Sequence, residues 1–79
     1  MSTIDYADTW DRTEVWWDDK WKLWGVTAYT ADGDQVGATE WCVTRSEAID
    51  DASAYIESGR CKRTVVYTKA GNVLQVHLL

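Results

Sequence analysis

The sequence predicts an α+β fold in which one helix packs on one face of a four-stranded antiparallel sheet, in the order ββαββ. Only the segment from Thr44 to Gly59 has the apolar period of a helix. The segments on both sides of it have strand composition, and Asp32-Gly33 and Ala70-Gly71-Asn72 supply hairpin turns. The sheet has five strands if Thr13 to Trp17 also pairs.

The helix is marked at both ends. Thr44 can accept the amide N–H of Glu47, whose side chain can reach back to the amide of Thr44, as in a capping box. Gly59 supplies a left-handed stop. The larger apolar residues between these ends share one face, and they are Ala48, Ile49, Ala52, Tyr55 and Ile56. This stripe needs a sheet to cover it.

The 79 residues hold one domain, and the net charge of −5 belongs to the N-terminal part. Residues 1–19 carry six acids and one base, whereas acids and bases balance in the remainder. We expect residues 1–12 to form a flexible acidic aromatic arm and residues 13–79 to form the single ββαββ domain.

Residues 20–43 are expected to form a hairpin around Asp32-Gly33. A two-residue loop there places Trp24 opposite Trp41, with both side chains toward the helix. Glu40 then lies on the other face, as expected because a mid-strand carboxylate is costly to bury without a partner.

The last two strands are expected at Thr64 to Lys69 and Val73 to Leu79. Their alternation places Val65 and Tyr67 toward the helix and Val66 away from it. The first of these two strands should lie antiparallel beside the first strand of the preceding hairpin. That order fails if the segment before residue 20 pairs there instead.

Residues that could support catalysis or metal binding are scarce. His77 is the only histidine, and Cys42 and Cys61 flank opposite ends of the helix, roughly 20 Å apart at about 1.5 Å per residue. This separation is too long for a disulfide, and the set lacks the paired spacing of zinc ligands. We expect no enzyme activity, no cofactor and no metal.

We expect a cytoplasmic protein with buried free thiols and no membrane partner, because no apolar run approaches a membrane span and no signal peptide is evident.

The stretch D-Y-A-D-T-W-D-R-T-E-V-W-W-D-D alternates carboxylates with large aromatics. Such a segment can dock in a groove of a basic partner, burying Trp while the acids steer the approach. Alternatively, Trp16 and Trp17 fold back over the sheet face that carries Leu23 and Tyr29. We expect a non-catalytic protein-interaction module, and the expected partner-binding residues are Trp10, Trp16, Trp17, Asp18, Asp19, Trp21, Leu23 and Tyr29.

The alternative function is nucleic-acid binding through Arg60, Lys62 and Arg63, although cations also follow a helix C-terminus for dipole reasons. The net negative charge makes nucleic acid the less favoured partner. We also expect a homodimer, because one helix covers only one sheet face and the uncharged last strand does not protect its edge.

Three stretches resemble a family of small bacterial and phage ββαββ domains of unknown function. They are W-G-V at Trp24 to Val26, T-R-S-E-A-I-D-D-A at Thr44 to Ala52, and V-V-Y-T-K-A-G-N at Val65 to Asn72. The resemblance implies a compact accessory domain, such as a phage-encoded modulator of a host protein acting in the host cytoplasm. It implies no residue chemistry.

A weaker likeness, through Trp24-Gly25 and an E-A-I helix, is to the WGR domains of poly(ADP-ribose) polymerases. Those domains carry Arg where this chain has Val26, so the likeness does not carry a DNA-end contact over to this chain.

Overall fold

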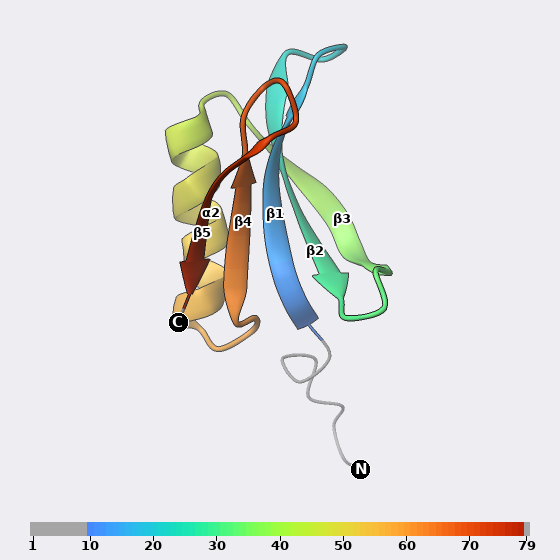
Figure 1. Cartoon of the computed structure of the whole chain (residues 1–79), viewed down its shortest axis with the longest axis vertical. Helices are drawn as coiled ribbons and strands as arrows, with labels where there is room; N and C mark the ends of the chain where they lie inside the picture. Colours follow the sequence, from blue (N-terminus) through green and yellow to red (C-terminus); the bar gives the residue numbers. More distant parts are fainter. Residues whose placement is uncertain (1–9, 79) are drawn as a thin grey trace.

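The computed structural model describes residues 10–78, which form a five-stranded sheet with one helix on one face (Figure 1). The α+β class is therefore confirmed. The elements are β1 (Trp10–Asp18), β2 (Leu23–Thr30), β3 (Gln35–Cys42), α2 (Arg45–Glu57), β4 (Arg63–Tyr67) and β5 (Val73–Leu78). Most of the arm expected over residues 1–12 lies outside the described residues, and β1 begins at Trp10.

The central strand is β1, in the sheet order β3-β2-β1-β4-β5. It pairs antiparallel with β2 and parallel with β4, where Thr13 lies opposite Thr64 and Val15 opposite Val66. The prediction of a purely antiparallel sheet with β4 beside β2 is wrong. After the helix β4 does run antiparallel to β2, as expected, but β1 lies between them and runs in the same direction as β4. The sheet is therefore mixed.

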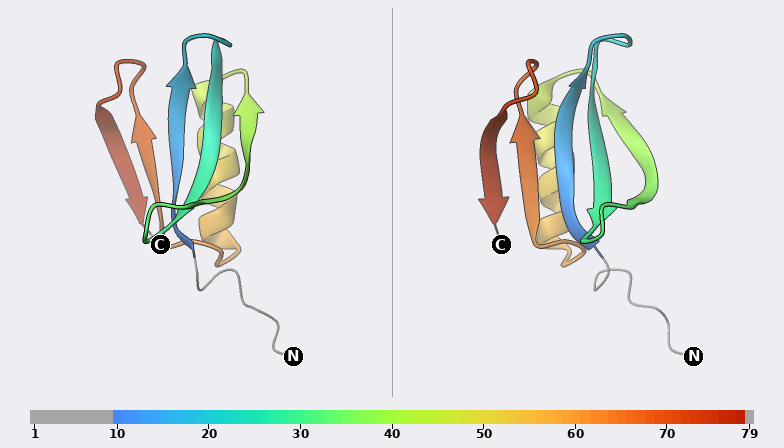
Figure 2. Two further views of the ribbon diagram at one scale, coloured as in Figure 1. Left: turned by 90° about the vertical axis from the view of Figure 1, so that its right-hand side faces the viewer. Right: turned by 45° about the vertical axis from the view of Figure 1, so that its right-hand side comes forward.

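Burial explains why β1 occupies the centre. Thr13 and Val15 are both 0% exposed, as is typical of a strand that has neighbours on both sides and a helix over one face. Val15 belongs to a core with Trp24 and Val26 of β2, Val66 of β4, and two alanines of α2. Figure 2 shows α2 on one side of the sheet, and we call the opposite side the open face.

The β2–β3 hairpin loop is one residue longer than expected. The N–H of Thr30 donates to the carbonyl of Asp34 at 2.9 Å, so three residues form the loop, and Gly33 adopts a φ of 90°. Further along, β3 has a bulge in which Gly37 has a φ of 68°. The bulge gives β3 two more residues than β2 over this stretch, and because two is an even number the side-chain alternation is kept.

This one-residue difference exchanges the two faces of β3. Trp24 lies opposite Cys42, and Gly25 lies opposite Trp41. Trp41 consequently lies on the open face, and Glu40 lies on the helix side, opposite to both predictions. Glu40 can lie on the helix side because its carboxylate stays exposed and accepts a hydrogen bond from the hydroxyl of Tyr55 in α2.

The faces of β4 are also reversed relative to the prediction. Val66 is 0% exposed in the core, because it pairs with Val15 of β1. Val65 lies on the open face, opposite Val76 of β5. Tyr67 follows the alternation of Val65, so the valine and tyrosine predicted to contact the helix belong to the open face.

The helix agrees with its predicted signals. Thr44 is the N-cap and its side chain accepts from the amide of Glu47 at 3.1 Å. Gly59 follows the C-cap with a φ of 78°. The buried residues of α2 are Ala48, Ala52 and Ile56. In the part of the chain that the structure describes, no helix is both long and apolar enough to cross a membrane.

Candidate functional site

The open face carries a cluster of large apolar side chains near one end of β1, β2 and β3. We call it the open-face aromatic patch, and it consists of Trp16, Trp21, Leu23 and Trp41. Trp16 comes from β1, Leu23 from the start of β2, and Trp41 from the end of β3. Trp21 lies in the turn between β1 and β2. The patch therefore joins the β1–β2 hairpin to the end of β3.

Trp16 is the fixed base of the patch. Its indole lies directly over Gly25, where an added Cβ would come within 2.8 Å of Cε2 of the ring. Its Nε1 donates to the hydroxyl of Thr27 at 3.0 Å. The ring makes an edge contact with Trp41, with 5.4 Å between centroids. Packing on a glycine and one directed hydrogen bond together hold the indole in a single orientation.

An apolar hollow of about 380 Å³ adjoins this base and is lined by Trp21, Leu23 and Trp41. Trp21 is 66% exposed and Trp41 is 45% exposed. The backbone N–H of Trp21 is fixed, because it donates to Oδ1 of Asp18 at 2.9 Å. The hollow is thus formed in the free protein, with two indoles presented to solvent.

The other end of β1 and β2 on the open face is polar. The guanidinium of Arg12 is 2.7 Å from Glu14, 3.0 Å from Asp11, and lies over the ring of Tyr29 at 5.1 Å. Asp11 also pairs with Arg63 at 2.9 Å, and hydrogen bonds from Arg63 and then Arg12 lower the pKa of its carboxyl. Tyr29 therefore belongs to a charged network rather than to the aromatic patch.

Two of the tryptophans predicted to bind a partner lie on the helix side. The ring of Trp10 is 5.3 Å from that of Tyr55, and the ring of Trp17 is 5.3 Å from that of Trp24. The ammonium of Lys69 lies 4.1 Å from the Trp17 ring. Trp16 and Trp17 cannot both fold over the open face, because successive residues of a strand point to opposite faces.

Asp18 and Asp19 stabilise the turn that carries Trp21. Asp18 accepts from the backbone N–H of Lys20 as well as from that of Trp21, each at 2.9 Å. Asp19 pairs with Lys22 at 2.9 Å, and this hydrogen bond lowers the pKa of the Asp19 carboxyl. The two carboxylates thus have a local structural role in this turn.

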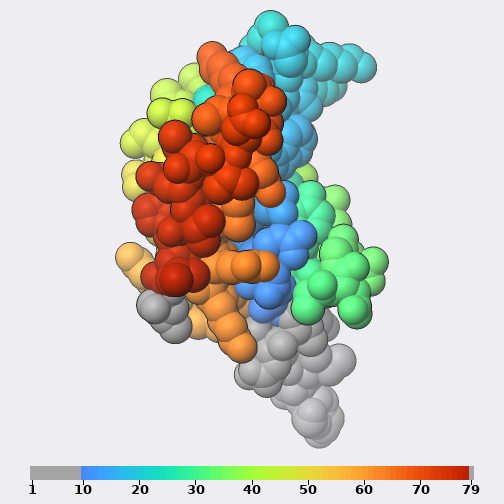
Figure 3. Space-filling model, in the orientation of Figure 1, coloured from blue at the N-terminus to red at the C-terminus, as the bar shows by residue number. Residues whose placement is uncertain are grey.

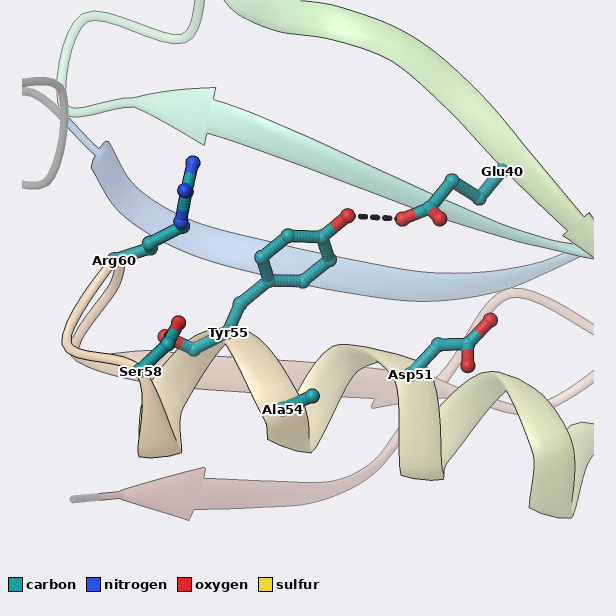
Figure 4. A pocket seen from close by; sticks show the side chains of 6 residues that line it. All are labelled: Glu40, Asp51, Ala54, Tyr55, Ser58 and Arg60. Atoms are coloured by element: carbon teal, nitrogen blue, oxygen red, sulfur yellow. Dashed lines mark hydrogen bonds between the residues drawn. The ribbon is translucent and has the colours of Figure 1, made fainter.

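A second, polar pocket of about 530 Å³ lies on the helix side (Figure 4). Its lining residues are Glu40, Asp51, Ala54, Tyr55, Ser58 and Arg60. The hydrogen bond to Glu40, followed by burial, raises the pKa of Tyr55 to about 12. Beside the pocket, burial and then the hydrogen bond from its Sγ to Asp51, at 3.2 Å, raise the pKa of Cys42 to about 12. Both groups stay protonated near neutral pH, which disfavours a nucleophilic role.

Two of the three basic residues after the helix have partners. Arg60 lies over the Trp10 ring at 6.0 Å, and Arg63 pairs with Asp11. Lys62 is exposed between them. Within residues 10–78 no group of three or more His, Cys, Asp or Glu side chains could hold a metal ion. The Cys61 thiol is buried, and burial raises its pKa.

Comparisons with protein-family models, with curated proteins and with solved structures found no match to this chain. The resemblances to small ββαββ domains and to WGR domains stay predictions. The geometry of the open face therefore carries the functional argument alone.

Proposed function

We propose that this protein is a non-catalytic interaction module that binds a partner protein through the open-face aromatic patch. The observation that carries the proposal is the preformed apolar hollow between Trp21, Leu23 and Trp41. Tryptophans that are fixed in place and surrounded by apolar neighbours are the residues that contribute most at protein interfaces.

The apolar area available supports this role. An aromatic side chain has roughly 150–250 Å² to bury, so Trp21 at 66% exposure and Trp41 at 45% exposure together retain roughly 200 Å². Covering that area contributes about 5 kcal/mol before the costs of association are subtracted. The turn of Asp18 and the contact with Trp16 reduce those costs, because the two indoles need little further ordering.

Charge and thiol chemistry suggest the kind of partner and the setting. The net charge of −5 favours a partner with a basic surface, which the acids would steer toward the patch. Cys42 and Cys61 are free and buried, as is common in reducing compartments, so we place the protein in the cytoplasm. If the chain is phage-encoded, the compartment is the host cytoplasm and the partner a host protein. A second copy of the chain is a further proposed partner.

Affinity capture with matched variants tests the proposal. Trp41→Ser removes one wall of the hollow, whereas Val43→Ser changes a residue that is 72% exposed and does not line it. We expect the wild type and Val43→Ser to retain the same protein from a bacterial lysate, and Trp41→Ser to retain at least ten-fold less. Thermal unfolding of all three establishes that each is folded. Equal retention by Trp41→Ser, or no retained protein, contradicts the proposal.

A further inference from the structure

The two edges of the sheet differ in how well they are protected from pairing with another strand. On β3, a two-residue bulge near Gly37 and the charged Glu40 interrupt the edge, whereas the bulge of β5 is confined to Leu74, near the start of the strand. On β5, the sequence from Val73 to Leu78 is V-L-Q-V-H-L, with no acid, lysine or arginine. Its large apolar side chains, Val73, Leu74, Val76 and Leu78, are 46–73% exposed. An edge of this kind is a template for a further strand.

The helix leaves this edge accessible. α2 packs against β1, β2, β3 and β4. β5 lies on the far side of β4, at the edge of the sheet (Figure 2). A hollow of about 280 Å³ lies beside β5 on the helix side, lined by Ser53, Ile56, Glu57, His77 and Leu78. In the space-filling view β5 lies at the surface along one side of the molecule (Figure 3).

The strand is also complementary to itself. From Leu74 to Leu78 the order apolar, polar, apolar, polar, apolar is symmetric about Val76. β5 pairs regularly with β4 from Gln75 to Leu78, and its bulge lies at Leu74. An antiparallel copy centred at Val76 would place Gln75 opposite His77, with Leu74 at the end of the pair beside Leu78. Within one chain Gln75 and His77 already form a hydrogen bond of 2.8 Å, so the two side chains are suitable partners. A two-fold axis requires this kind of self-complementary surface.

We propose that β5 pairs antiparallel with β5 of a second copy about a two-fold axis at Val76, joining two sheets into one. The pairing places the leucines and Val76 of both copies in one apolar row on the open face. It brings no like charges opposite each other on the paired strands. A six-residue pair is about 20 Å long, and the interface is roughly 1,000 Å², at the lower end of specific interfaces. An interface of this size is typical of weak, reversible association.

The dimer leaves the open-face aromatic patch free, because β5 lies at the far edge of the sheet from β3. A continuous sheet keeps both open faces on the same side. Two patches are then presented together, which raises avidity for a partner that is itself dimeric or repetitive. The pairing itself does not depend on the proposed function of the patch.

Sedimentation velocity at concentrations from about ten micromolar to about one millimolar tests the pairing. The wild type should change from a 9.0 kDa particle to one of twice that mass. Leu78→Lys places a charge on the paired edge and should weaken dimerisation at least ten-fold. Val43→Lys is the matched control, since Val43 is 72% exposed and Leu78 is 73% exposed. It should dimerise as the wild type does.

The register is tested separately by Val76→Cys. Directly opposed residues of an antiparallel pair lie about 4.5–5.5 Å apart at Cα, within reach of a disulfide. Oxidation should crosslink this variant and leave Val43→Cys monomeric, while the buried Cys42 and Cys61 do not react. A 9.0 kDa particle at every concentration, or a dimer unaffected by Leu78→Lys, overturns the proposal. If dimerisation fails but the monomeric Leu78→Lys variant still captures a partner, only the β5 pairing is rejected. The proposed function of the patch then stands.

Discussion

The buried hydroxyl pair between β1 and β4 provides a sharp test of the topology. Oγ1 of Thr13 and Oγ1 of Thr64 lie 2.7 Å apart, and both residues are 0% exposed. The sulfur of Cys61, at 4.0 Å from the Thr13 hydroxyl, is a weak additional neighbour. Thr13→Val keeps the shape of the side chain but leaves the Thr64 hydroxyl buried without a good partner.

The expected energies follow from that loss. Each single variant, Thr13→Val or Thr64→Val, should lower the free energy of unfolding by about 1–2 kcal/mol, because one buried hydroxyl is left unsatisfied. The double variant replaces both hydroxyls with methyl groups and should lie within about 1 kcal/mol of the wild type. The two substitutions therefore compensate each other, with a coupling energy of about 2 kcal/mol.

Urea unfolding followed by tryptophan fluorescence measures all four proteins. For a domain of this size each 1 kcal/mol corresponds to about 4–8 °C in the melting temperature, so thermal scans provide a second readout. The reasoning is refuted if the single variants are neutral or if their effects simply add. Either result would mean that the hydroxyls of Thr13 and Thr64 are not paired in the core, and would contradict the β1–β4 register.

Two further predictions concern the patch and the helix side. Gly25→Ala should displace the Trp16 indole, because the new Cβ would lie 2.8 Å from Cε2 of the ring. The free energy of unfolding should fall by about 1–3 kcal/mol. An unchanged indole signal and an unchanged urea midpoint would contradict this packing. Burial and then Asp51 raise the pKa of Cys42 from 9.0 to about 12. Above about pH 9 the thiol ionises in the unfolded chain but keeps its proton in the folded protein, so the free energy of unfolding should fall as the pH rises. Urea midpoints measured from about pH 8 to about pH 10 should fall less steeply for Cys42→Ala than for the wild type, and equal slopes would refute this assignment.

The helix was predictable from sequence because its signals are local. Thr44 accepts from a residue three positions on, and Gly59 adopts the left-handed conformation that its type favours. The place of β1 was not predictable in this way. Its partner Thr64 lies 51 residues away from Thr13, and nothing in T-E-V-W-W itself identifies which strand will lie beside it.

The patch was predictable only in part, for a related reason. Trp16, Trp21 and Leu23 were selected as partner-binding residues, and the structure brings them to the same side of the sheet. A two-residue loop would place Trp41 on the helix side. The loop has one additional residue, which reverses every side chain of β3 and places Trp41 on the open face. Trp17 does not belong to the patch with Trp16, because neighbours in a strand point to opposite faces.

The division of the six tryptophans between the two sides of the sheet allows the most direct test of the proposed function. On the open face are Trp16, Trp21 and Trp41, and on the helix side are Trp10, Trp17 and Trp24. Each indole N–H gives its own signal in a nitrogen–proton correlation spectrum, recorded with and without the protein captured by the wild type. The proposal predicts that the three open-face signals shift and that the three helix-side signals keep their positions. Shifts confined to the helix-side indoles, or no shifts at all, would contradict binding through the open face.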